Sequence, residues 1–169
     1  MINKNDLREE IEIFTQFIRT RLELSSPLDM VDVVKKLGVT CTPVEEVPYD
    51  ARIFSKDDLY VIEYDKDQIY ERRQFSIAHE LGHFLLHILN KDDTPQNVYY
   101  RRNGNSSAIE WEANEFAASL LMPRDEFRNF CMDNVDIDGK VDLSKIANFF
   151  GVSKQAARVR GSVLGLWII

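Results

Sequence analysis

The run from Phe75 to His87 constrains this chain more than any other stretch, because it joins a helical apolar pattern to histidines at helical spacing. An α-helix advances about 100° per residue, so side chains four residues apart lie on one face. His79 and His83 have this spacing, and both imidazoles therefore point the same way. We expect a helix over residues 70–89 that displays two potential metal ligands on one side.

The residue beside the first histidine suggests what such a site does. Zinc takes neutral imidazole ligands, and catalytic zinc sites combine three protein ligands with water in the fourth position. Glu80 is adjacent to His79, where its carboxylate can reach that water and act as general base. This spacing is the HExxH pattern of zinc metalloproteases. The alternative is an ordinary amphipathic helix, but with three histidines in the chain chance explains the arrangement poorly.

A later helix, opened by Ser106 and Ser107, offers a third ligand. Several residues one helical turn apart share a face of it: Glu110, Ala113, Asn114, Ala117 and Leu121. Small side chains on that face allow the backbone to approach the histidine helix closely. Glu110 would then project toward the two histidines, and Asn114 would orient an imidazole through its other ring nitrogen.

Other assignments of these residues stay open. Glu112 and Glu115 are competing acids on other faces of the same helix, and Ser107 and Glu110 have the spacing of a capping box. His87 continues the four-residue series, but eight residues from His79 it has rotated about 80° away. We interpret His87 as a packing or supporting histidine.

The remaining chain predicts a small α+β domain. Apolar periodicity indicates a helix over residues 6–23, and a second helix capped by Ser26 and ended by Gly38. Short strands over 39–44, 51–54 and 59–64 form a small antiparallel sheet. The third is either an edge strand that pairs with extended substrate or an interior strand. We predict a mostly helical, zincin-like single domain over 1–169, with this sheet packed on the histidine helix.

Composition limits the partners and the compartment. The chain has 21 basic and 28 acidic residues, a net charge of −7, so we do not expect direct nucleic-acid binding. Cys41 and Cys131 lie far apart without a second thiol nearby, as expected for reduced core residues. The short apolar runs predict no membrane span, and the first residues do not have the pattern of a signal peptide. We expect a cytoplasmic protein.

Three further segments carry patterns that resemble known binding motifs or loops. Residues 134–142 imitate the start of a calcium loop, but the twelfth position is Lys145 instead of glutamate, so we expect a polar turn with Asp142 capping the next helix. Residues 143–162 form a helix-turn-helix-like hairpin within the domain. Residues 90–107, with Tyr99-Tyr100-Arg101-Arg102, are either a lid or binding loop or a solvated connection.

Two segments resemble the ImmA/IrrE family of zinc metallopeptidases: the run from Arg73 to His87, and the run from Glu110 to Pro123. The resemblance covers about residues 28–166. It implies zinc ligands at His79, His83 and Glu110, with Glu80 as catalytic glutamate. Asn114 departs slightly from the aspartate found at this position in the wider gluzincin group.

The resemblance also implies a substrate. Members of the family cleave a helix-turn-helix repressor, often encoded alongside, and thereby derepress mobile-element or stress genes. The function expected for this chain is therefore a zinc-dependent endopeptidase acting on such a repressor. The rival expectation is a non-catalytic zinc-containing module that captures the repressor without cutting it.

Overall fold

A computed structural model describes residues 3–89 and 107–167, which divide into two compact units. Residues 29–117 form one, here called the sheet unit, and residues 1–28 with 118–169 form the other, the helical unit. Among the described residues, helices are more numerous than strands and contain more residues. The predicted mostly helical α+β class is therefore confirmed. A single domain over residues 1–169 remains a prediction.

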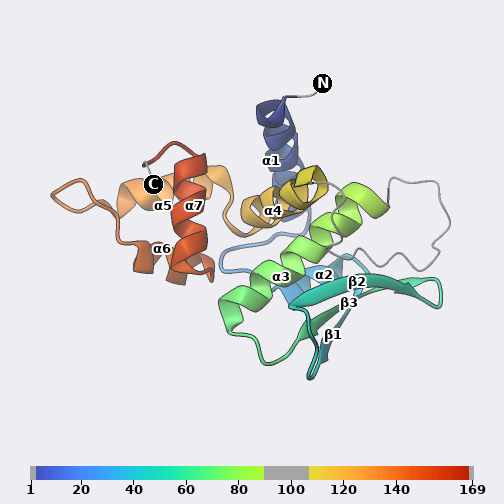
Figure 1. Ribbon diagram of the computed structural model, residues 1–169. Coiled ribbons are helices and arrows are strands. Elements are labelled where there is room, and N and C mark those ends of the chain that lie inside the picture. The colour runs from blue at the N-terminus through green and yellow to red at the C-terminus, as the bar shows by residue number, and fades with distance from the viewer. Residues whose placement is uncertain (1–2, 90–106, 168–169) are drawn as a thin grey trace. The chain divides into compact units, whose positions relative to one another are not determined.

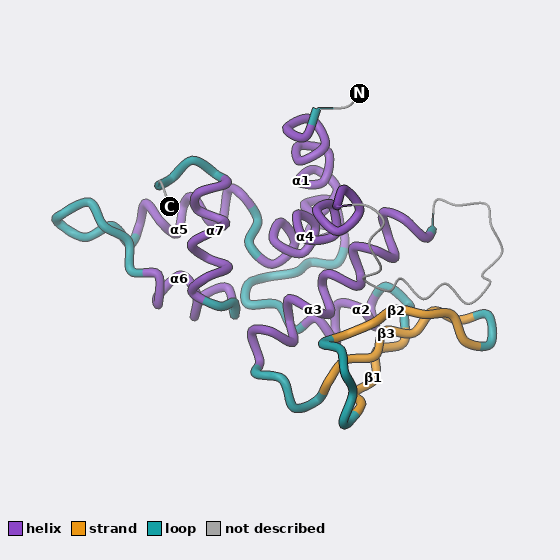
Figure 2. Tube along the Cα trace, viewed as in Figure 1, coloured by secondary structure: helices purple, strands orange, loops and turns teal. Residues whose placement is uncertain are grey.

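The described residues of the sheet unit form three strands in the order β1-β3-β2, shown in Figure 2. They are β1 (Thr40–Val44), β2 (Ala51–Lys56) and β3 (Leu59–Asp65). β2 and β3 pair antiparallel, whereas β1 and β3 pair parallel. The sheet is therefore mixed, and the expectation of a purely antiparallel sheet was wrong for β1. The chain reverses between successive strands, but β3 inserts between β1 and β2, which leaves β1 beside a strand of its own direction.

The second helix begins later than predicted. α2 spans Met30–Lys36, and its N-cap is Asp29, whose side chain accepts a hydrogen bond from Val31 N–H. Ser26 lies upstream and instead bonds Glu126 through its hydroxyl. The predicted Ser26 cap was wrong because Asp29 is an equally good capping residue next to the first helical turn.

The histidine helix packs on the sheet. α3 (Tyr70–His83) continues into a π-helical turn, η1 (Phe84–Ile88), where Leu89 N–H bonds the carbonyl of Phe84. α3 contacts β2 and β3, and its buried face is formed by apolar side chains. The fully or nearly buried core residues of this contact are Ile53, Ile62, Ile77 and Leu81. Gln74 on α3 accepts the Met30 N–H at 2.6 Å and so ties α2 to α3.

The helical unit contains α1 (Lys4–Arg21), α5 (Arg124–Asp133), α6 (Leu143–Phe150) and α7 (Lys154–Val163), shown in Figure 1. Phe127 and Phe150 stack in its core with ring centroids 5.4 Å apart. A buried ion pair joins Arg160 to Glu12 at 2.6 Å, and Arg160 also donates to the carbonyl of Met122. A charge buried with its counter-ion and a backbone acceptor avoids the cost of an unpaired charge.

The two motifs near the C-terminal end have structural explanations. Asp136 accepts hydrogen bonds from the backbone N–H groups of Asp138 and Lys140, and Asp142 caps α6 through Ser144 N–H. The polar turn and the cap are thus confirmed. Gly151, at φ 64°, ends α6, and α7 follows after a short turn, which gives the expected helical hairpin.

Both cysteines are buried and free, as expected. Burial raises the pKa of each thiol to about 11, which keeps them protonated and unreactive. In the part of the chain that the structure describes, no helix combines the length and the apolar character that a bilayer crossing needs.

Candidate metal centre

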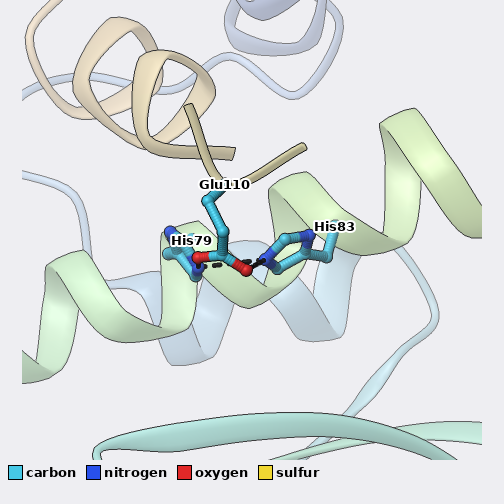
Figure 3. Close-up of side chains that lie close together, drawn as sticks. All are labelled: His79, His83 and Glu110. Atoms are coloured by element: carbon cyan, nitrogen blue, oxygen red, sulfur yellow. Dashed lines mark hydrogen bonds and ion pairs between the residues drawn. The ribbon is translucent and has the colours of Figure 1, made fainter. Parts of the chain in front are cut away.

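The first two residues of the site come from consecutive turns of α3. His79 and His83 direct their Nε2 atoms toward one point, and these atoms are 3.0 Å apart (Figure 3). Their rings meet edge to face, with centroids 4.6 Å apart. The four-residue spacing predicted this arrangement, and the structure confirms that the two imidazoles converge.

The third residue comes from α4 (Ser107–Leu121). Glu110 places one carboxylate oxygen 3.4 Å from His79 Nε2 and the other 3.3 Å from His83 Nε2 (Figure 3). Tetrahedral ligands at about 2.0–2.1 Å from a zinc ion lie roughly 3.3 Å from one another. Two imidazole nitrogens and a carboxylate at these separations therefore fit zinc in both chemistry and spacing.

Close packing of α4 on α3 brings Glu110 within reach. A Cβ added at Gly82 would lie 3.0 Å from Cδ1 of Phe116, so the absence of a side chain at Gly82 permits the contact. Ala113 and Ala117 are fully buried on the same side of α4. The predicted stripe of small residues thus explains how the carboxylate reaches the histidines.

Asn114 lies one turn beyond Glu110 and contacts the first histidine. Its Oδ1 is 3.0 Å from Nδ1 of His79. Because the amide oxygen of Asn114 can only accept, Nδ1 of His79 donates in this contact, and Nε2 is left facing His83 and Glu110. The amide therefore holds the imidazole in the tautomer and orientation that a metal ligand requires.

Burial keeps His83 in its metal-binding form. Its side chain is 3% exposed, and desolvation lowers the pKa of the imidazole to about 3, with smaller contributions from His79 and His87. A neutral imidazole has a lone pair for a metal, whereas an imidazolium does not. Glu110 is 41% exposed, so solvent reaches this carboxylate.

Glu80 does not join the ligand cluster. It turns toward the sheet, where Oε2 accepts a hydrogen bond of 3.0 Å from the backbone N–H of Ile53 on β2. Sequence reasoning placed Glu80 beside the site but missed Ile53. No side-chain signal marks a backbone donor, and only the position of β2 along α3 identifies it.

The third strand was expected to be either an edge strand or an interior strand. β3 is the interior strand, and β2 is the edge strand nearest to Glu80. Sequence pattern alone left these two alternatives open, because it does not give strand order.

The competing acids and the third histidine lie outside the cluster. Among the described residues, the carboxylate that groups with the two histidines is that of Glu110, not those of Glu112 or Glu115. His87 is buried, with its ring 5.6 Å from that of His83 and Nδ1 3.7 Å from Glu112. The side chain of Ser107, and with it the capping-box alternative, lies outside the described residues, as do Tyr99-Tyr100-Arg101-Arg102.

Comparison with known families defines the class of protein. A peptidase family model, described as the IrrE N-terminal-like domain, matches residues 34–162. This match covers most of the chain, and the chain therefore belongs to the IrrE N-terminal-like domain family. The resemblance to ImmA/IrrE peptidases is confirmed, and membership supports a metallopeptidase-type function. No curated protein matches the chain.

A solved structure shares the fold. The chain is similar to a Mycobacterium tuberculosis transcriptional regulator, with a TM-score of 0.69 and 18% sequence identity. The similarity covers 91% of this chain and 46% of the regulator, so this chain spans just under half of that protein's length. At this identity the likeness concerns the fold alone.

Proposed function

We propose that this chain is a zinc-dependent endopeptidase. The observation that carries the proposal is the convergence of His79, His83 and Glu110, whose ligand atoms lie within 4.8 Å of one another on two packed helices. Glu80, on the same helix as the histidines, supplies the carboxylate that peptide hydrolysis needs. Family membership supports the same class of reaction.

The proposed ligands are the Nε2 atoms of the two histidines and the carboxylate of Glu110. A zinc ion held there would lower the pKa of a water molecule and polarise the scissile carbonyl. Asn114 keeps His79 oriented, and the burial of His83 keeps that ligand neutral. Exposure of Glu110 leaves an approach for water and substrate from one side.

Glu80 would move the proton. Its carboxylate accepts a proton from the attacking water as the water oxygen bonds to the peptide carbon. It then gives that proton to the amide nitrogen as the carbon–nitrogen bond breaks, so the products are a carboxylic acid and an amine, which ionise to carboxylate and ammonium. The residue returns to its starting state and no further reactant is consumed.

We propose an extended segment of a helix-turn-helix repressor as substrate. The resemblance to ImmA/IrrE peptidases supports the repressor, and the position of β2 beside Glu80, at the edge of the described sheet, supports the extended conformation. An added strand satisfies the outward backbone groups of an edge strand while its side chains are selected by the adjacent surface.

The test is whether zinc-loaded protein cleaves a purified helix-turn-helix repressor that is encoded next to it. The wild type should release discrete fragments. Glu80→Gln should retain one zinc per chain but lose cleavage by at least about 10³-fold, because an amide accepts no proton. His79→Ala should lose both zinc and cleavage. Glu71→Gln, which alters another carboxylate of α3 far from the ligands, is the matched control and should behave as wild type.

The same experiment separates the rival function. A non-catalytic repressor-binding module would form a complex with the repressor in size-exclusion chromatography but release no fragments, with or without zinc. Cleavage that persists in Glu80→Gln would instead contradict the proposed role of Glu80.

A further inference from the structure

We propose that the backbone N–H of Ile53 is a positioning group for Glu80. It holds the carboxylate oxygen Oε2 at the sheet and thereby restricts the rotamers of the group that would remove a proton from water. The inference rests on the proposed function, because it assigns a role in proton transfer. It adds a group on the sheet to a site otherwise built from two helices.

The hairpin geometry explains why this N–H points away from the sheet. Asp57 and Asp58, both with positive φ, form a two-residue turn that makes Lys56 and Leu59 the closing pair. In an antiparallel pair, hydrogen-bonded and non-hydrogen-bonded positions alternate from that point. The pair of Ile53 with Ile62 is non-hydrogen-bonded, so the N–H of Ile53 is directed outward.

The donor is held rigidly. The side chain of Ile53 is 2% exposed and anchors β2 to the core beneath α3. Pairing with β3 on one side and the contact of α3 with the sheet leave the strand little freedom to shift. The 3.0 Å bond to Glu80 Oε2 therefore connects the Glu80 carboxylate to a fixed point on the sheet.

This connection matters because a glutamate side chain has several rotatable bonds. A general base acts efficiently only within hydrogen-bonding reach of the proton it removes. Hydrogen bonds from backbone N–H groups to carboxylates are charge-assisted and strong enough to select one rotamer. Ile53 thus supplies through its main chain the orientation that Asn114 supplies to His79.

The bond also sets how a substrate strand meets β2. Ala51 and Ser55 flank Ile53 at alternate positions, and their main-chain groups face the same edge. An extended peptide would bond these two residues, with its backbone opposite Ile53 lying closest to Glu80. The scissile bond is therefore expected opposite Ile53.

The first test needs no metal and no substrate. In metal-free protein, amide hydrogen exchange at Ile53 should accelerate at least tenfold in Glu80→Ala and remain near the wild-type rate in Glu80→Gln, whose carbonyl still accepts. The Ser55 amide, which faces the same edge, and the core amide of Ile62 are controls that should not change. Equal exchange at Ile53 in wild type and Glu80→Ala would overturn the proposal.

The second test removes the donor alone. Replacing Ile53 by its α-hydroxy acid turns the amide into an ester and retains the side chain. We expect kcat to fall at least tenfold, KM to change less than twofold, and zinc content to stay constant. The same replacement at Phe54 removes an N–H directed at β3, so it should lower thermal stability but leave kcat unchanged.

The outcomes distinguish this inference from the proposed function. Loss of activity in Glu80→Gln with full activity in the Ile53 ester would overturn the positioning role and leave the peptidase intact. A wild type without zinc-dependent cleavage would overturn the peptidase, while the exchange measurement would still decide whether Ile53 holds Glu80.

Discussion

His79 and Asn114 are joined by a 3.0 Å contact between Nδ1 and Oδ1, through which the amide on α4 orients an imidazole that we propose as a zinc ligand on α3. The contact fixes which ring nitrogen is left for a metal. Asn114→Ala should therefore weaken zinc affinity about 10–100-fold, the usual cost of losing such a partner. Asn114→Asp retains an acceptor and should bind zinc at least as tightly as wild type. Competition with a chromophoric chelator measures both, and wild-type affinity in Asn114→Ala would contradict the assignment.

Gly82 determines how closely the two helices approach. Gly82→Ala should destabilise the fold by about 1 kcal/mol, since crowding against buried Phe116 outweighs the helix-propensity gain of alanine. Urea denaturation of the metal-free protein measures the change. Phe116→Leu added to Gly82→Ala should recover part of the lost stability. A Gly82→Ala variant more stable than wild type would show that Phe116 and α4 shift to accommodate the methyl group at little cost.

The lowered pKa of His83 makes stability depend on pH. An unfolded chain binds a proton at this histidine near pH 6.5, whereas the folded protein excludes it until about pH 3. The unfolded state therefore binds more protons in this window, and the unfolding free energy of metal-free protein falls as pH decreases, by at most about 1.4 kcal/mol per pH unit from this group. His83→Gln should show a shallower decline between pH 7 and 5. If the unfolding free energies of the two proteins fell equally with pH, the lowered pKa of His83 would be contradicted.

The buried ion pair in the helical unit should be sensitive to removal of one partner. Arg160→Met removes the nearest counter-ion of the buried Glu12 carboxylate, leaving only Arg124 at 4.0 Å, and should cost about 3 kcal/mol. Adding Glu12→Leu removes the stranded charge and should restore much of that stability. Guanidinium unfolding curves compare the variants. Additive losses in the double variant would show that the two residues act independently.

Local periodicity predicted the features that depend on a single helix. The spacing of His79 and His83 depends only on helix geometry, and the small residues beside Glu110 indicated the face that would approach them. The structure adds that the absence of a side chain at Gly82 permits the close contact with Phe116.

Features that depend on contacts between distant segments were missed. Nothing local to β1 shows that β3, and not β2, would be its neighbour, so the parallel pairing was not anticipated. The bond from Ile53 to Glu80 involves main chain and therefore has no residue signature. At α2, Ser26 and Asp29 are both good caps, and tertiary contacts to Ser26 decided between them.

Zinc titration of metal-free protein tests the central claim most directly, with Glu110→Ala compared against Glu112→Ala. Both variants remove a carboxylate from α4, two residues apart, but only the first removes one that groups with His79 and His83. The account predicts one tight site in wild type and Glu112→Ala, and an affinity at least about 100-fold weaker in Glu110→Ala. Wild-type affinity in Glu110→Ala, or loss of the site in Glu112→Ala, would contradict it.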